Sequence, residues 1–330
     1  MLFREDKTAR ADAEAVRKNV GWYCWTHDLV EVRGTDAHEL LDYICVNNIS
    51  DTVGVSKYTT MLNDEGKILD DTIVTCMAEN VYWVSTLYAP QMVKWMDSHK
   101  GSLDVAYRDM TGEMDMYAIQ GPNSPAVLNT LLAAPVDGLK RFAVADNKIG
   151  QIPVIIHRSG FTGENGFEVY CDMADAPAVK AAIRAACDAH NAPELTVLEV
   201  YVRSLPTEKG FALRQDMYLL TPYECGLGWS VDLSKDFIGK QALLAAKEAG
   251  PKQVLVGLEY LAESYEDIAQ KEIVYYKGVP CGRVKAAIYG YTVDKNIGYA
   301  VIDARKAIEG REVTVGCNHS PAVIVKKCWL

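Results

Sequence analysis

Two adjacent carboxylates, Asp70 and Asp71, stand inside the apolar run 68–76 and are the residues best placed for chemistry. An ionised carboxylate is costly to bury unless it has a partner. Side chains alternate along a strand, so we expect the two residues to face opposite sides and at most one to point into a given cavity. The pattern fits an active-site carboxylate or an edge strand with two solvated charges.

A glycine-rich turn is the second candidate, because Gly160, Gly163 and Gly166 surround Glu164. Glycines let the backbone approach a ligand closely and place Glu164 at the tip of the turn. A carboxylate there can accept paired hydrogen bonds from a guanidine-like edge, either a nearby arginine or the 2-amino-pyrimidinone edge of a pterin. The plainer interpretation is a hairpin with an exposed glutamate.

Aromatic residues next to glycines mark a third segment, 221–229, which contains Tyr223 and ends in Gly228 and Trp229. Such residues can form the wall of a site for a flat ligand. Ordinary loop packing explains them equally well, and for Trp229 alone packing in the core is the favoured interpretation.

Hairpins and helices alternate among the elements that must position these residues. Apolar–polar alternation and turn residues predict strands at 29–33, 58–77 (a hairpin turning at 63–66), 81–86, 116–120, 152–158 and 166–171. Helical spacing predicts helices around 36–44, 89–99, 124–132, 176–190 and 241–250. Asp36 and Glu39 resemble a capping box at the first of these helices. This mixture predicts an α+β fold rather than a doubly wound parallel sheet.

The character of the chain changes near residue 250. Gly250 and Pro251 form a helix stop signal, and short β runs separated by Gly, Asp and Asn follow to the C-terminus. Such runs are typical of a small barrel or sandwich. We therefore expect two domains, residues 1–250 and residues 251–330.

Composition excludes several classes of function. The net charge is −10 with no Lys/Arg cluster, so a nucleic-acid partner is not expected. Neither a signal peptide nor a membrane span is recognisable, and the nine scattered cysteines include no C-x-x-C pair, which predicts a cytoplasmic protein with reduced thiols. The six histidines lack ligand spacing, so no metal is expected. Dinucleotide and P-loop fingerprints are absent.

Taken in order, these segments resemble the aminomethyltransferase family, which comprises the glycine-cleavage T-protein and its tetrahydrofolate-dependent demethylase relatives. The resemblance runs from Ala15 to the C-terminus. The matching pieces are Val32-Arg33-Gly34, Tyr58, residues 61–66, Asp70-Asp71, residues 120–123, residues 160–164, Gly228-Trp229 and residues 236–240. The resemblance implies a clover-leaf of α+β lobes with a C-terminal β-barrel, and tetrahydrofolate in the central channel.

The same resemblance implies roles for individual residues. Asp70, the first of the pair, lies by the reactive nitrogens of the folate, and Glu164 holds the pterin edge. The residues implied to border the folate are Tyr58, Ser85, Phe161 and Trp229. Our candidates for the acid that protonates the leaving group are Tyr223 and His27, where His27 matches the Ser-His-Met triplet of the family and is equally well explained as a packed histidine.

Some positions depart from the family pattern. Pro206 stands where the family has the arginine associated with the acidic tail of the folate, and Arg203 and Arg214 are near enough in the sequence to replace it. Ser85 replaces an asparagine and Phe161 a tyrosine. The Pro- and aromatic-rich segment of a T-protein has no counterpart before residue 15. These changes argue against glycine cleavage and leave folate binding intact.

We therefore expect a tetrahydrofolate-dependent methyltransferase that demethylates a small O-, S- or N-methylated compound and yields 5-methyltetrahydrofolate. One alternative is a T-protein that takes an aminomethyl group from a lipoylated carrier protein. The other is a non-catalytic folate-binding regulatory or maintenance protein. That alternative is weakened because residues 209–216 lack the cysteine of the motif those relatives carry.

Overall fold

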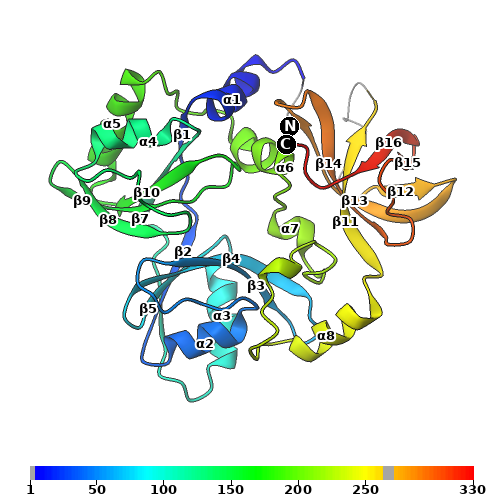
Figure 1. The fold of residues 1–330 in the computed structure, drawn as a ribbon, viewed down its shortest axis with the longest axis horizontal. Coiled ribbons are helices and arrows are strands. Elements are labelled where there is room, and N and C mark those ends of the chain that lie inside the picture. Colours follow the sequence, from blue (N-terminus) through cyan, green and yellow to red (C-terminus); the bar gives the residue numbers. More distant parts are fainter. Residues whose placement is uncertain (1–3, 263–270) are drawn as a thin grey trace.

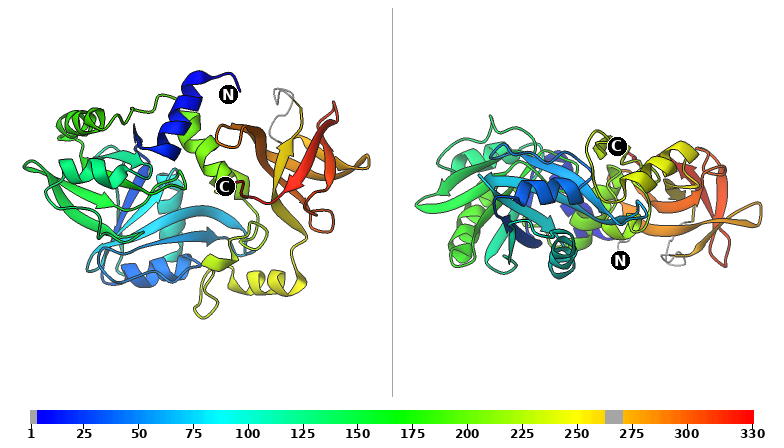
Figure 2. Two further views of the ribbon diagram at one scale, coloured as in Figure 1. Left: turned by 45° about the horizontal axis from the view of Figure 1, so that its top comes forward. Right: turned by 90° about the horizontal axis from the view of Figure 1, so that it is seen from below.

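The computed structural model describes residues 4–262 and 271–330, which form three lobes around a common centre (Figure 1). Two lobes are α+β, the third is a β-barrel, and short helices fill the space between them. Seen from below, the lobes lie side by side in a flattened arrangement (Figure 2). The predicted α+β clover-leaf with a C-terminal barrel is confirmed.

The first lobe is an antiparallel sheet of order β3-β4-β5-β2-β6. Its elements are β2 (Asp28–Arg33), α2 (Ala37–Ile44), β3 (Ser56–Leu62), β4 (Ile68–Ala78), β5 (Val81–Thr86), α3 (Ala89–His99) and β6 (Ala106–Asp109). Alternate residues of β4 and β5, such as Val74 and Val84, pack with Leu40 of α2 in one core. The opposite face, where Ile73 pairs with Ser85, is left to line the centre of the molecule.

The second lobe has the strand order β1-β7-β10-β9-β8. Its elements are β1 (Gly21–Cys24), β7 (Met114–Gln120), α4 (Ser124–Leu131), β8 (Val144–Ile149), β9 (Ile152–His157), β10 (Gly166–Asp172) and α5 (Ala176–Ala189). Phe167 and Val169 of β10 join the apolar core of this lobe. Because strand side chains alternate, Glu168 and Tyr170 face the other way, toward the centre.

Helix α1 (Lys7–Lys18) precedes both lobes and is not among the helices predicted from the sequence. The side chain of Asp6 caps it by accepting a hydrogen bond from the Ala9 amide at 2.9 Å. Ala9, Ala13 and Val16 are buried on one face. None of the helices in the described residues is long and apolar enough to cross a membrane.

The centre of the molecule is built from short segments. These are the π-helical turn η1 (Val200–Ser204), α6 (Leu205–Glu208), α7 (Arg214–Met217) and the 3-10 turn η2 (Gly228–Ser230). A π-helical turn interrupts regular helix geometry and is frequent at functional sites. Here it brings Tyr201 and Val202 to the central cavity.

The third lobe is a closed barrel of order β11-β14-β13-β12-β15-β16. The strands are β11 (Gln253–Tyr260), β12 (Ile273–Tyr276), β13 (Val279–Gly290), β14 (Lys295–Asp303), β15 (Glu312–Val315) and β16 (Ser320–Val325), preceded by α8 (Lys240–Ala249). Of the barrel and sandwich that the sequence allowed, the barrel forms. The boundary near residue 250 stays a prediction; it falls between α8 and β11.

Candidate functional site

A cavity of about 710 Å³ lies where the lobes meet. It is lined by the inner faces of both sheets, by η1, by residues 209–215 and by Lys327 and Cys328 near the C-terminus. A volume of this size lies within the range of small-molecule sites. The cavity is therefore the candidate active site.

Both members of the carboxylate pair line this cavity. Asp70 accepts a hydrogen bond from the Thr86 hydroxyl at 2.8 Å, and its other oxygen lies 3.5 Å from Nε of Arg214. Burial raises the pKa of Asp70, and the Thr86 hydrogen bond and Arg214 oppose that rise. Neighbouring side chains leave a strand on opposite faces, yet both of these residues line the cavity, contrary to the expectation that at most one would.

Asp71 is held differently from its neighbour. Its carboxylate accepts a hydrogen bond from the Tyr58 hydroxyl at 3.1 Å. Burial raises the pKa of Asp71 to about 7, and the nearby charge of Asp70 adds to the rise. Near neutral pH the Asp71 side chain can thus hold or release a proton inside the cavity, which is the property a general acid needs.

An aromatic pair stands beside these carboxylates. The rings of Tyr58 and Trp229 are stacked, with centroids 5.7 Å apart and planes at 23°. Trp229 is 70% exposed, so it is not a core residue. An exposed, stacked indole at a cavity wall is suited to contact a flat ligand.

A second carboxylate site is formed by Glu168 on β10. Glu168 pairs directly with His157 of β9, so that their side chains share one face of the sheet. One oxygen of Glu168, Oε2, lies 3.2 Å from Nδ1 of His157 and accepts a hydrogen bond from the Tyr170 hydroxyl at 3.2 Å. Burial alone would raise the pKa of Glu168, but the hydrogen bonds from His157 and Tyr170 outweigh it and lower the pKa. The buried carboxylate is therefore kept ionised.

The hydrogen bonds extend from Glu168 in two directions. Nε2 of His157 lies 3.1 Å from the Ser56 hydroxyl, which in turn contacts Thr75. On the other side, Nε2 of His27 lies 3.0 Å from the Tyr170 hydroxyl. Oε1 of Glu168 accepts no hydrogen bond from the described residues. That oxygen is available to a ligand in the cavity.

Aromatic rings cover much of the remaining cavity wall. The aromatic residues contributed by the two sheets, η1 and the loops include Trp25, Trp83, Phe161, Tyr201 and Phe211. Phe161 and Phe211 lie 5.9 Å apart between ring centroids. Large apolar walls with few polar groups are typical of small-molecule sites.

Six of the eight residues selected from the sequence line the cavity. They are His27, Tyr58, Asp70, Ser85, Phe161 and Trp229. Tyr223 is not among the lining residues, and its ring lies 5.7 Å from the Lys247 amine. Tyr223 therefore does not lie where the acid predicted from the sequence would have to lie, whereas His27 does line the cavity.

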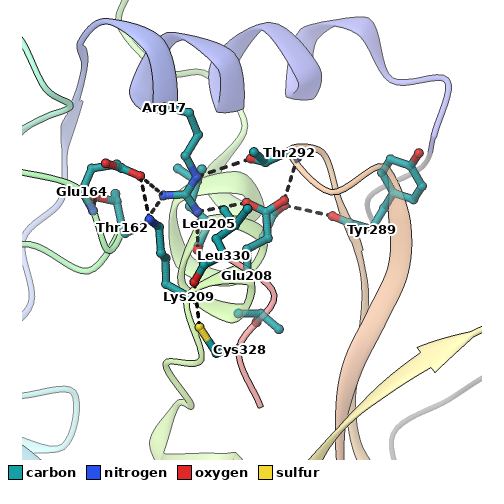
Figure 3. Close-up of polar contacts among 12 residues, drawn as sticks. Arg17, Thr162, Glu164, Leu205, Glu208, Lys209, Tyr289, Thr292, Cys328 and Leu330 are labelled. Atoms are coloured by element: carbon teal, nitrogen blue, oxygen red, sulfur yellow. Dashed lines mark hydrogen bonds and ion pairs between the residues drawn. The ribbon is translucent and has the colours of Figure 1, made fainter. Parts of the chain in front are cut away.

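Glu164 is the other selected residue that does not line the cavity. Its Oε1 lies 3.0 Å from Nη1 of Arg17 and 3.2 Å from the Lys209 amine (Figure 3). The sequence left two partners open for this carboxylate, an arginine or a pterin edge. The structure supplies the arginine, from a helix that the sequence analysis did not predict.

Sequence reasoning gave no role to Glu168 or His157. The signal was present, since Glu168 is a carboxylate inside the apolar run 166–171, the same pattern that singled out Asp70. Its partner could not be foreseen, because the pairing of β9 with β10 decides which residue faces it.

Comparisons with known proteins cover both parts of the chain. Residues 3–235 match the GCVT N-terminal domain, and residues 253–330 match the glycine cleavage T-protein C-terminal barrel domain. An aminomethyltransferase of Bacillus licheniformis is 33% identical over 305 residues, which span 89% of this chain and 82% of the relative. An aminomethyltransferase of Streptomyces avermitilis is 33% identical over 327 residues, which span 94% of this chain and 86% of the relative.

A solved structure shares the fold. The crystal structure of glycine cleavage system aminomethyltransferase T from Bartonella henselae has a TM-score of 0.85 and covers 98% of this chain and 89% of its own. Its sequence identity is 24%, so the likeness concerns the architecture of the three lobes.

Proposed function

The chain belongs to the aminomethyltransferase family, and from this premise we propose that it binds tetrahydrofolate in the central cavity and transfers an aminomethyl carbon to it from a lipoylated carrier protein. The observation that carries the proposal is the placement of Glu168, Asp70 and Asp71 around one cavity in a chain related over nearly its whole length to aminomethyltransferases. This reverses the ranking expected from the sequence, where demethylation of a small compound came first.

The cavity meets the needs of a reduced pterin. The 2-amino-4-oxo edge of a pterin presents adjacent N–H donors, which pair well with an ionised carboxylate. Glu168 is ionised and has a free oxygen in the cavity, so we assign the pterin edge to Glu168. Glu164, the residue that the family resemblance implied, has Arg17 and Lys209 as partners instead.

The flat ring system also needs an apolar wall. Phe161 lies on the same loop-and-strand segment as Glu168, and Tyr58 and Trp229 offer a stacked pair near the carboxylates. Ring stacking contributes about 0.5–1.5 kcal/mol per pair beyond the area buried. Together these contacts would orient the folate with its reacting edge toward Asp70 and Asp71.

The transfer needs alignment and proton movement. The carbon leaves the sulfur of the carrier and becomes bonded to N5 and N10 of the folate, the sulfur and the departing nitrogen each gain one proton, and ammonia is released. Holding the donor carbon in line with N5 can contribute about 7–11 kcal/mol. We propose that Asp70 balances charge on the folate nitrogens and that Asp71, whose pKa is about 7, supplies a proton to the leaving group. His27, the second candidate acid, also lines the cavity.

A second candidate is transfer of a methyl group from a small methylated donor. Ser85 and Phe161 stand in the cavity wall where the family resemblance implies asparagine and tyrosine, and Pro206 replaces an arginine. These substitutions change the surroundings of the folate and favour a donor other than the carrier.

Product mass separates the two candidates. The protein is incubated with tetrahydrofolate and either an aminomethylated lipoyl carrier or a panel of methoxy, methylthio and methylamino compounds. The proposed function predicts 5,10-methylenetetrahydrofolate and ammonia from the carrier. Formation of 5-methyltetrahydrofolate from a small donor, with none of the methylene product from the carrier, would establish the second candidate instead.

A further inference from the structure

Arg214 is a cavity residue whose guanidinium is fixed in place by its surroundings. It stands at the start of α7 and lines the cavity. Its Nε donates a hydrogen bond to the Leu69 carbonyl at 2.6 Å and lies 3.5 Å from Oδ1 of Asp70. The carbon at the centre of the guanidinium lies 4.0 Å from the Tyr88 ring centroid and 4.6 Å from that of Tyr218. These contacts hold one edge and the plane of the group.

The opposite edge of this guanidinium is unused. Neither Nη1 nor Nη2 of Arg214 makes a hydrogen bond to any residue in the ranges 4–262 and 271–330. The side chain is 25% exposed and belongs to the lining of the cavity, so a ligand there can reach it. An arginine of known orientation with two free parallel N–H groups matches the geometry of a carboxylate.

The other cations of the cavity are placed differently. Lys209 is paired with Glu164, and the Lys327 amine donates to the Cys225 carbonyl. Arg203, the other arginine considered from the sequence, is absent from the cavity lining and bonds Asp216 at 2.8 Å. Arg141 lines the cavity from an exposed loop position, where its guanidinium lies over the Phe142 ring.

We infer that Arg214 binds a carboxylate group of a molecule that occupies the cavity, through paired hydrogen bonds from Nη1 and Nη2. This inference rests on the proposed function only for the identity of that molecule. The carboxylate has two sources, the glutamate tail of tetrahydrofolate or a carboxyl group on a small one-carbon donor. Asp70 lies beside Arg214, so a donor carboxylate bound there would be held close to the predicted reacting centre, whereas the glutamate tail is separated from the reacting nitrogens by the p-aminobenzoyl group.

Binding measurements with four probes separate the sources. Tetrahydrofolate is compared with 6-methyltetrahydropterin, which has the pterin but no glutamate. The neutral 4-methoxybenzamide is the matched twin of 4-methoxybenzoate, which carries a carboxylate and a methyl group. Calorimetry under anaerobic conditions gives the affinity of each probe for the native protein, Arg214→Gln, Arg214→Lys and the control Arg141→Gln.

Loss of the paired charge-assisted bonds should weaken binding by about tenfold or more. If the carboxylate belongs to the folate tail, Arg214→Gln weakens the binding of tetrahydrofolate and leaves the binding of 6-methyltetrahydropterin unchanged. If it belongs to the donor, Arg214→Gln weakens the binding of 4-methoxybenzoate and leaves the binding of tetrahydrofolate and of 4-methoxybenzamide unchanged. Arg214→Lys keeps the positive charge but loses the paired N–H donors of the guanidinium. Its affinity for the carboxylate probe should therefore lie between those of the native protein and Arg214→Gln.

The inference is overturned if Arg214→Gln binds all four probes within twofold of the native protein, or if Arg141→Gln loses as much affinity as Arg214→Gln does. A melting curve for each variant establishes that it is folded. If Arg214→Gln does not fold, the affinities of Arg214→Lys are compared with those of the native protein instead. Failure of the proposed function is a separate result. In that case the native protein binds neither tetrahydrofolate nor 6-methyltetrahydropterin, and the benzoate arm still tests Arg214.

Discussion

Arg17 and Glu208 form an ion pair of 2.9 Å between α1 and α6, in which Arg17 is 6% and Glu208 0% exposed (Figure 3). The same guanidinium contacts Glu164 and donates to the Thr162 and Leu205 carbonyls. It also reaches the Thr292 hydroxyl of the barrel at 3.3 Å. One side chain thus joins α1, the glycine-rich turn, the central helices and the barrel.

Replacing Arg17 should therefore destabilise the whole molecule. Arg17→Met leaves the buried Glu208 without its charged partner, and breaking a buried pair in this way costs about 3–5 kcal/mol. Urea unfolding of the variant should show that loss. The double variant Arg17→Met with Glu208→Gln should recover part of it, because the unpaired buried charge is gone.

Lys18 provides the matched control for Arg17. Its side chain is 73% exposed, and its one ion pair with the residues that the structure describes is an i,i+4 pair with Glu14. Lys18→Met should change the free energy of unfolding by less than about 1 kcal/mol. Equal losses in the Lys18 and Arg17 variants would show that the ion pair is not the source of the stability.

Asp70 is predicted to act in the transfer step. Asp70→Asn keeps the shape of the side chain and removes its charge, so turnover should fall by about 10²-fold or more, the lower end of the range for such catalytic groups. Folate affinity should change much less. Steady-state kinetics and calorimetry on one preparation provide the comparison. Asp71→Asn should lower turnover as well, because Asp71 is the proposed acid. Native-like turnover in Asp70→Asn, or a loss of folate affinity as large as its loss of turnover, would contradict the role of Asp70.

The raised pKa of Asp71 predicts a pH dependence of stability. Its pKa is about 7 in the folded protein, against about 3.9 for an ordinary aspartate. Between these values the folded state retains a proton that the unfolded state has released, so this contribution to stability is complete below about pH 4 and is lost as the pH rises to about 7.

Asp71→Asn should remove that contribution. Thermal melts at pH 5 and pH 8 should show a smaller fall in melting temperature for Asp71→Asn than for the native protein. Asp64→Asn, in the exposed hairpin turn, is the control variant, and its melting temperature should fall as much as that of the native protein. An identical fall in the native protein and Asp71→Asn would show that Asp71 does not titrate in this range.

Trp229 should matter for binding and not for folding. At 70% exposure it contributes little to the core, and its ring contacts Tyr58 at the cavity wall. Trp229→Ala should weaken tetrahydrofolate binding by about 0.5–1.5 kcal/mol and leave the melting temperature within a few degrees of native. A large fall in melting temperature with unchanged affinity would show that the indole is structural.

The sequence predicted the regular elements well where periodicity was strong. The hairpin of β3 and β4 and the helices α3 and α5 lie where alternation and helical spacing indicated. The capping box at Asp36 did not form. The Asp36 side chain makes no cap hydrogen bond and instead accepts one from the Asp104 amide at 2.8 Å. A contact distant in the sequence replaced the local one.

From the sequence, only those site residues could be predicted that stand out from their immediate neighbours. Asp70 was visible as a charge in an apolar run, and Trp229 as an aromatic beside glycine. The partner of Glu164 was not visible, because Arg17 is 147 residues away and reaches it only through the docking of α1. Local pattern alone could not decide which of Glu164 and Glu168 faces the cavity, since that follows from how the second lobe packs.

The most direct test of the account compares these two glutamates in tetrahydrofolate binding. Calorimetry is performed on the native protein, Glu168→Gln and Glu164→Gln, each checked by its melting curve. Removing the ionised partner of the pterin edge should cost about 1–3 kcal/mol, a loss of roughly 5- to 150-fold in affinity for Glu168→Gln. Glu164→Gln should bind within a few fold of native, because the Glu164 carboxylate does not line the cavity and pairs with Arg17 and Lys209. Absence of folate binding by the native protein, or a loss in Glu164→Gln that exceeds the loss in Glu168→Gln, would contradict the account.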